Sequence, residues 1–358
     1  MDTRLLWFVL TGFISSTDSF VLGSLLPSIS AEFGITIGEA GYLAFAYSIV
    51  YAIGTPLLAT LFGNVERRKV LIAAEATFAV GAVMMVLAPT FPLLIAARVV
   101  VALGVGLFTA MALTTALAMS PPERRGRTIA IFMSGQSLAV LAGVPLGAFV
   151  VSAYSWRVIY MAVAVMVLVA VAGLVWNLPR GIHGDKVTLR ERLSVVKLPG
   201  IPLALLSMLL FNMAQFTLVI FVAPLAQYAG GLGKEMLPYA LFVYGIGAVV
   251  GMQSGGRIAD RIGARRATVL ATALPIVLFA ALAAAGSLPA SLGAVAFFLI
   301  MPAIGVVGWS FYPAQASLLS SRVPGSPVLA LSLNLTAMNI GVALAARLGG
   351  AAAGLAES

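Results

Sequence analysis

Two ionisable residues lie deep within long apolar runs of the sequence. Asp18 lies about 13 residues into the first run, roughly 20 Å from its start if the run is helical. Arg98 lies inside the fourth run. Ionisable groups at such depth are costly and usually functional, and loss of water favours the neutral form of an acid. Asp18 could therefore bind and release a proton, or could be a carboxylate neutralised by a structural partner such as Arg98.

Arg98 and Glu75 each allow a simpler interpretation. The Arg98 guanidinium can pair with Asp18 or with backbone carbonyls, or it can extend outward to the bilayer surface as a packing residue. Glu75 lies only about five residues inside its run, roughly 8 Å from the start at the helical rise. We therefore expect Glu75 to be an interfacial carboxylate near Arg67 or Arg68.

The composition places these residues in a membrane protein. Of the 358 residues, 61% are hydrophobic and 9% are charged, whereas soluble domains have about 25% charged residues. There is no cysteine, which excludes disulfides and thiolate metal sites, and the single histidine, His183, lies in a polar stretch. We expect no cofactor and no metal. The net charge of +9 comes from short clusters between apolar runs, so we expect no nucleic-acid partner.

Eleven runs have the length and apolarity of a membrane-spanning helix, which takes about 20 residues. The first run is too long for a signal peptide and lacks a small-residue cleavage site. The predicted spans are 5–29, 40–63, 70–88, 92–119, 128–151, 158–178, 200–227, 236–256, 267–286, 290–316 and 328–350.

The distribution of Lys and Arg predicts the orientation. With a cytoplasmic N-terminus, seventeen basic residues lie on the cytoplasmic side and three, Arg157, Lys234 and Arg347, lie outside. The odd number of spans places the C-terminus outside. A polar segment and a faint repeat of the Arg67–Leu71 sequence near Arg265 divide the chain into an N-terminal six-helix bundle (1–178), a cytoplasmic loop (179–199) and a C-terminal five-helix bundle (200–358).

Residues 256–266 form a short motif between spans eight and nine, with the sequence GRIADRIGARR. This motif resembles the G-x-x-x-D-R-x-G-x-R-R loop of the major facilitator superfamily. Span one (Thr17 to Pro27), span four (Arg98 with two glycines) and span five (Gly143 to Gly147) extend the resemblance to the drug:proton antiporter branch, near its arabinose-exporter-like and chloramphenicol-exporter-like members.

The resemblance implies a two-bundle helical transporter, and the sequence departs from the family pattern at three points. Phe62 stands where the first-half copy of the loop motif has Asp. In span five, Val144 and Ala148 replace two glycines of the antiporter signature. The family has twelve spans, and a twelfth is absent here.

The resemblance also implies roles for individual residues. It favours a role for Arg98 in proton coupling and implies a conformational latch between helices at the loop motif, where the alternative is an ordinary topology-setting loop. The latch residues are Gly256, Asp260, Arg261, Gly263, Arg265 and Arg266.

Small residues four apart let two helix backbones approach closely. Span five has this spacing at Gly143 and Gly147, which flank Pro145, and span eight has it at Gly247, Gly251 and Gly255. We expect spans five and eight to pack against each other along these faces, with generic packing against other helices as the alternative.

Amide and aromatic residues in the second half are candidates for a substrate cavity. A mostly apolar cavity with a few such groups suits amphipathic organic molecules, although hydrogen bonds between helices explain each residue equally well. The candidates are Asn212, Gln215, Trp309, Tyr312, Gln315, Asn334 and Asn339.

The sequence thus predicts a monomeric, multi-pass transporter of the inner membrane whose partners are protons, lipid and a small-molecule substrate. The leading hypothesis is proton-coupled efflux of drug-like or sugar-like molecules by alternating access. An uncoupled facilitator or nutrient importer is the alternative, and it would not need the buried acid. An intramembrane enzyme is a remote alternative, because no paired acids or Ser/His combination lies within the spans.

Overall fold

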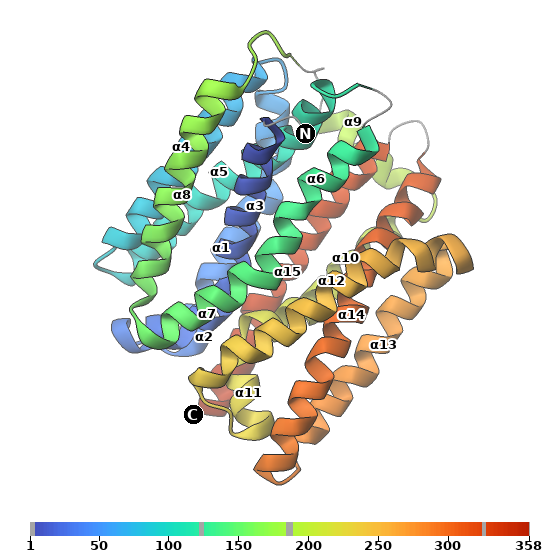
Figure 1. Cartoon of the computed structure of the whole chain (residues 1–358). Coiled ribbons are helices and arrows are strands. Elements are labelled where there is room, and N and C mark those ends of the chain that lie inside the picture. Colours follow the sequence, from blue (N-terminus) through green and yellow to red (C-terminus); the bar gives the residue numbers. More distant parts are fainter. Residues whose placement is uncertain (1–3, 122–124, 184–188, 324–326, 358) are drawn as a thin grey trace.

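The fold is a bundle of long helices (Figure 1). The computed structural model describes residues 4–121, 125–183, 189–323 and 327–357, and all regular secondary structure in these ranges is helical. Eleven of the described segments are long and apolar enough to cross a membrane. The all-α membrane fold and the eleven predicted spans are therefore confirmed.

The helices before the central loop form spans one to six. Their bounds are α1 (Arg4–Phe33), α2 (Ile37–Ala40), α3 (Tyr42–Leu61), α4 (Arg67–Leu87), α5 (Phe91–Ala118), α6 (Arg125–Leu138), the π-helical turn η2 (Ala139–Gly143), α7 (Val144–Ala153) and α8 (Trp156–Asn177).

The remaining helices include two short turns in the central loop. Their bounds are α9 (Leu189–Ser194), η3 (Val195–Lys197), α10 (Ile201–Ile220), α11 (Val222–Gly230), η4 (Lys234–Met236), α12 (Leu237–Ile262), α13 (Ala264–Ala285), α14 (Ala290–Arg322) and α15 (Pro327–Glu357).

Two predicted spans are interrupted near a proline. Pro145 follows the π-helical turn η2, and Pro224 lies just after the break between α10 and α11 at Phe221. A proline ring clashes with the carbonyl four residues earlier and lacks an N–H donor. A wider turn or a break relieves that clash.

The glycine row of span eight packs against span ten, so the prediction that it faces span five is wrong. A Cβ added at Gly247 or Gly251 of α12 would lie 2.1 Å from the carbonyl oxygen of Pro302 or Val306 on α14. The row in span five packs against α1, where Gly143 and Gly147 contact side chains of that helix.

Spans five and eight still touch, but on a different face of α12. A Cβ added at Gly245 would lie 2.6 Å from the carbonyl oxygen of Val140 in η2. A row of small residues allows close approach to any neighbour and does not encode which helix that neighbour is. The partner therefore depends on the packing of the whole bundle.

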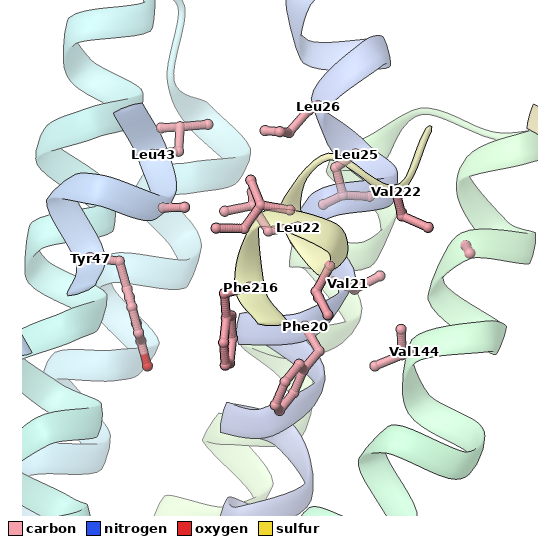
Figure 2. Close-up of a cluster of buried hydrophobic side chains, with 14 of the residues drawn as sticks. Phe20, Val21, Leu22, Leu25, Leu26, Leu43, Tyr47, Val144, Phe216 and Val222 are labelled. Carbon is pink, nitrogen blue, oxygen red and sulfur yellow. The ribbon is translucent and has the colours of Figure 1, made fainter. Parts of the chain in front are cut away.

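An apolar layer joins α1 to helices from both parts of the chain (Figure 2). Leu22, Leu25 and Leu26 of α1 are buried in one cluster with Phe216 of α10 and Val222 of α11. At Gly23 the α1 backbone is so close to α10 that an added Cβ would lie 2.0 Å from the carbonyl oxygen of Val219. The helices α1 and α10 are therefore in close contact at the level of this layer.

The helix α15 lies between the two groups of helices (Figure 1) and packs against both α3 and α10. The division into bundles 1–178 and 200–358 stays a prediction. Residues 184–188 of the predicted central loop lie outside the described residues. The same holds for two of the basic residues used to predict the orientation, Arg124 and Lys186.

Candidate functional site

A cavity of about 260 Å³ lies among six helices, on the N-terminal side of the apolar layer. Its wall comes from α1, α3, α5, α6, α10 and α15, so both parts of the chain contribute. The lining is mostly apolar, with hydroxyl and amide groups interspersed. These polar residues are Ser15, Ser16, Ser19, Tyr47, Ser48, Tyr51, Thr109, Gln136 and Asn339.

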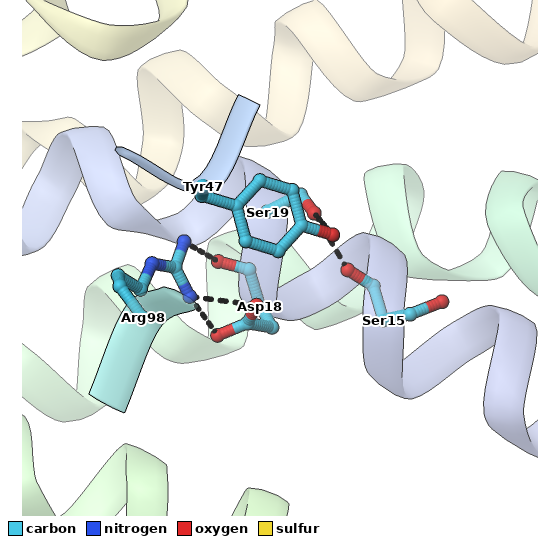
Figure 3. Close-up of polar contacts among 5 residues, drawn as sticks. All are labelled: Ser15, Asp18, Ser19, Tyr47 and Arg98. Atoms are coloured by element: carbon cyan, nitrogen blue, oxygen red, sulfur yellow. Dashed lines mark hydrogen bonds and ion pairs between the residues drawn. The ribbon is translucent and has the colours of Figure 1, made fainter. Parts of the chain in front are cut away.

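Asp18 and Arg98 form a buried ion pair beside this cavity (Figure 3). Arg98 Nη1 donates to Asp18 Oδ1 at 2.6 Å and to Oδ2 at 2.7 Å. The Asp18 and Arg98 side chains are 0% and 1% exposed. The pairing that was one of the alternatives at the sequence level is therefore observed, although the role of the pair in transport stays a prediction.

The two members of the ion pair lie differently relative to the cavity. The Arg98 guanidinium lies 4.8 Å from the ring centroid of Tyr47, whose hydroxyl lies within hydrogen-bond distance of the Ser19 hydroxyl, at 3.2 Å. Arg98, Tyr47 and Ser19 all line the cavity, whereas Asp18 does not. Of the two charged partners, Arg98 therefore borders the cavity and Asp18 does not.

Six of the seven predicted cavity residues do not line the cavity. Gln215 Nε2 and Trp309 Nε1 both donate to the Tyr244 hydroxyl, at 2.8 and 3.0 Å. The Tyr312 hydroxyl donates to Asn212 Oδ1 at 2.8 Å. These bonds join α10, α12 and α14, because polar side chains in a membrane protein find one another when water is absent.

Gln315 and Asn334 are likewise packed between helices. Gln315 Nε2 donates to the Ala204 carbonyl oxygen at 2.6 Å, and Asn334 is 7% exposed. Asn339 is the one predicted residue in the lining. Trp309 does not line the cavity, but its ring packs against the ring of the lining residue Phe20, with the two centroids 5.6 Å apart.

Most of the polar lining was not predicted from the sequence. Ser15, Ser16 and Ser19 stand within four residues of Asp18, and this cluster in an apolar run was the available signal. The signal is weak because a serine can satisfy its hydroxyl on its own helix, as Ser19 does with the Ser15 carbonyl oxygen at 2.9 Å.

The loop motif joins α12 to α13 through Gly263, whose φ of +86° suits glycine. Asp260 is exposed and makes no hydrogen bond or ion pair within the described ranges. The latch interaction is therefore not formed in this structure, and its role stays a prediction.

The expectation that Glu75 is an interfacial carboxylate is wrong. Its side chain is 0% exposed. Arg67 donates to Met111 Sδ and Arg68 donates to the Val175 carbonyl oxygen, so each arginine has a partner other than Glu75.

The cavity can be tested by thiol labelling, because the chain has no cysteine. Ser19→Cys and Gln136→Cys should react with a small polar methanethiosulfonate, since both positions line the cavity and are half-buried. Thr17→Cys on the same helix and Gln315→Cys should react much more slowly, because both positions are buried outside it. Equal rates for the four variants, measured by mass spectrometry, would contradict this placement of the cavity.

Sequence comparison identifies a family and several relatives. The Major Facilitator Superfamily profile matches residues 8–346. A chloramphenicol resistance protein of Streptomyces lividans is 34% identical over 333 residues, which cover 91% of this chain and 83% of that protein. The inner membrane transport protein YdhP of Escherichia coli K12 is 28% identical over 361 residues, covering 99% and 90%.

Solved structures share the fold. A bacterial homologue of the lysosomal transporter Spinster, in an inward-facing and occupied conformation, has a TM-score of 0.76 at 19% identity and covers 97% of this chain and 80% of its own. A peptide transporter, POT, has a TM-score of 0.73 at 13% identity and covers 99% and 92%.

Proposed function

Because this chain belongs to the major facilitator superfamily, we propose that it exports small organic molecules across the cytoplasmic membrane by alternating access, as a monomer, in exchange for protons. The family consists of transporters, and the fold is that of a multi-pass membrane protein. The proposal concerns the direction, the coupling and the class of substrate.

The buried ion pair carries the proposal of proton coupling. Asp18 is paired with Arg98 at 2.6 Å, and Arg98 borders the cavity whereas Asp18 does not. Separating Arg98 from Asp18 would leave the Asp18 carboxylate without its cationic partner in a site without water. The neutral form of the acid is favoured there. A conformational change that separates the two groups would therefore let Asp18 take up a proton, and their reunion would release it.

The shape of the cavity supports the proposal of alternating access. The cavity lies between helices of both parts of the chain, and the apolar layer around Leu22, Leu25 and Phe216 closes it on one side. In the predicted orientation the closed side faces outward. Its apolar wall with scattered hydroxyls suits a neutral amphipathic molecule. The name of the Streptomyces relative makes chloramphenicol a rational first probe.

Proton flux in proteoliposomes tests this proposal. An imposed pH gradient should drive accumulation of chloramphenicol, or of another member of a panel of drugs, sugars and nucleosides, and each substrate should elicit proton movement in the opposite direction. Transport that is unaffected when an ionophore collapses the gradient would instead indicate the uncoupled facilitator.

A further inference from the structure

A second acid is fully buried in the helices of residues 4–177. Within the described residues, Asp18 and Glu75 are the two buried carboxyl groups. Asp18 has a cationic partner, whereas both carboxyl oxygens of Glu75 lack a hydrogen-bond partner. The proposed function uses Asp18 and leaves Glu75 unexplained.

The surroundings of Glu75 are apolar. On α4 its neighbours one turn away are Leu71 and Phe78, and both are buried. The helix α5 packs closely here, because a Cβ added at Gly104 would lie 2.7 Å from the Ala74 carbonyl oxygen. There is no room for a hydrated ion between these two helices at this level.

One polar group faces the Glu75 carboxyl. It is the Thr11 hydroxyl of α1, which is itself buried and has no completed hydrogen bond. A threonine hydroxyl both donates and accepts, so it can pair with either form of the acid. One neutral hydroxyl replaces little of the hydration that an ionised carboxylate loses, so Thr11 does not act as a counter-charge for Glu75.

The charged and titratable groups on the helices around Glu75 lie at other levels or have other partners. Lys69 of α4 pairs with Glu66, and Arg4 of α1 lies about two turns from Thr11. On α4, Arg67 and Arg68 lie about two turns away and contact α5 and α8. On α5, Arg98 is paired with Asp18 of α1. On α8, the level of Gly173 and Leu174 has no titratable residue, and Tyr160 lies more than three turns away.

From this geometry we propose that Glu75 is a second proton-binding site, separate from the Asp18–Arg98 pair and occupied by a proton in this conformation. An unpaired carboxylate in such a site would lose its hydration without compensation, so the group neutralises instead. The proton can leave only when water or a base reaches the carboxyl, which requires one of the helices around Glu75 to move.

The position of Thr11 connects the two sites through one helix. Thr11 and Asp18 are seven residues apart, which places them on the same face of α1, about 10 Å from each other. A movement of α1 that parts Asp18 from Arg98 also shifts the Thr11 hydroxyl relative to Glu75. The occupancy of both sites would then respond to the same movement, a consequence that rests on the proposed function.

Infrared spectroscopy of the full chain in liposomes tests the proposal directly. At neutral pH, where an exposed glutamate is ionised, the wild-type protein should show the C=O stretch of a protonated carboxylic acid. Glu75→Gln should remove this band, and the band should shift when the protein is equilibrated in D2O. Glu75→Met is a second variant, because it also removes the acid and suits an apolar site.

Asp18→Asn is the matched control, because it removes the other buried acid. It should leave the protonated-acid band in place, since Asp18 is an ionised member of a pair here. A band that persists in both Glu75 variants, or a Glu75 carboxylate band at neutral pH, would overturn the proposal. These outcomes do not depend on substrate, so they stand even if proton-coupled transport by this chain is disproved.

Discussion

Asp18→Asn should abolish accumulation driven by a pH gradient while leaving exchange down a concentration gradient measurable. A one-proton exchanger can sustain about a tenfold concentration ratio for each unit of pH difference, because both correspond to about 1.4 kcal/mol. Without the Asp18 carboxyl this exchange is lost, and the ratio should fall to about one unless Glu75 also exchanges its proton during the cycle. The measurement is chloramphenicol accumulation in proteoliposomes at several imposed pH differences.

The ion pair requires a second variant to separate coupling from stability. Asp18→Asn leaves the Arg98 guanidinium buried without its counter-charge, and breaking a buried pair in this way costs about 3–5 kcal/mol. The double variant Asp18→Asn with Arg98→Gln removes both charges, so it should recover much of that stability. It should not recover coupling.

Two further variants complete this experiment. Asp18→Glu should retain some coupling, because it keeps a titrating acid at the position, and Arg98→Ala should change the pH dependence of transport. If Asp18→Asn still drives substrate uphill at the wild-type rate, the assignment of the proton to Asp18 is wrong.

Gly251→Ala should destabilise the protein by on the order of 3 kcal/mol, and Gly251→Leu should abolish transport. A Cβ at this position would lie 2.1 Å from the Val306 carbonyl oxygen, and a backbone atom cannot turn away as a side chain can. The helices α12 and α14 would have to separate along the whole glycine row and lose many small dispersion contacts. Thermal unfolding of the purified protein and a transport assay measure the two effects.

The same helix offers a matched control. Gly256 lies five residues further along α12, and a Cβ added there meets no atom within 4 Å. Gly256→Ala should therefore keep or slightly raise the unfolding temperature, because alanine favours a helix over glycine by about 1 kcal/mol. Equal destabilisation by Gly251→Ala and Gly256→Ala would show that helix propensity, and not the contact with α14, explains the loss.

The fold could be predicted because membrane constraints act locally along the chain. Each span needs a run of apolar residues and satisfies its own backbone hydrogen bonds, so eleven runs predicted eleven helices. The depth of Asp18 followed from its place in a run in the same way. Its partner could be inferred because few other deep charges were available.

The contacts between spans could not be read in this way. The glycine rows of spans five and eight had equal spacing, yet they pack against α1 and α14, because small residues permit an approach without selecting a partner. The amides of the second half were predicted to face the cavity, but most hydrogen bond to neighbouring helices. An amide looks the same in sequence whether its partner is a substrate or another helix.

Glu75 shows most clearly which properties follow from the sequence and which depend on the packing of the helices. Its position along the chain placed it near the cytoplasmic surface, beside two arginines, and this followed from the helical rise alone. Whether the side chain points to lipid headgroups or into the bundle depends on the rotation of α4 against α5 and α8. The apolar sequence of α4 sets this rotation weakly, because lipid and protein interior are similarly apolar for its side chains. The packing of the assembled helices turns Glu75 inward and its arginines toward other partners.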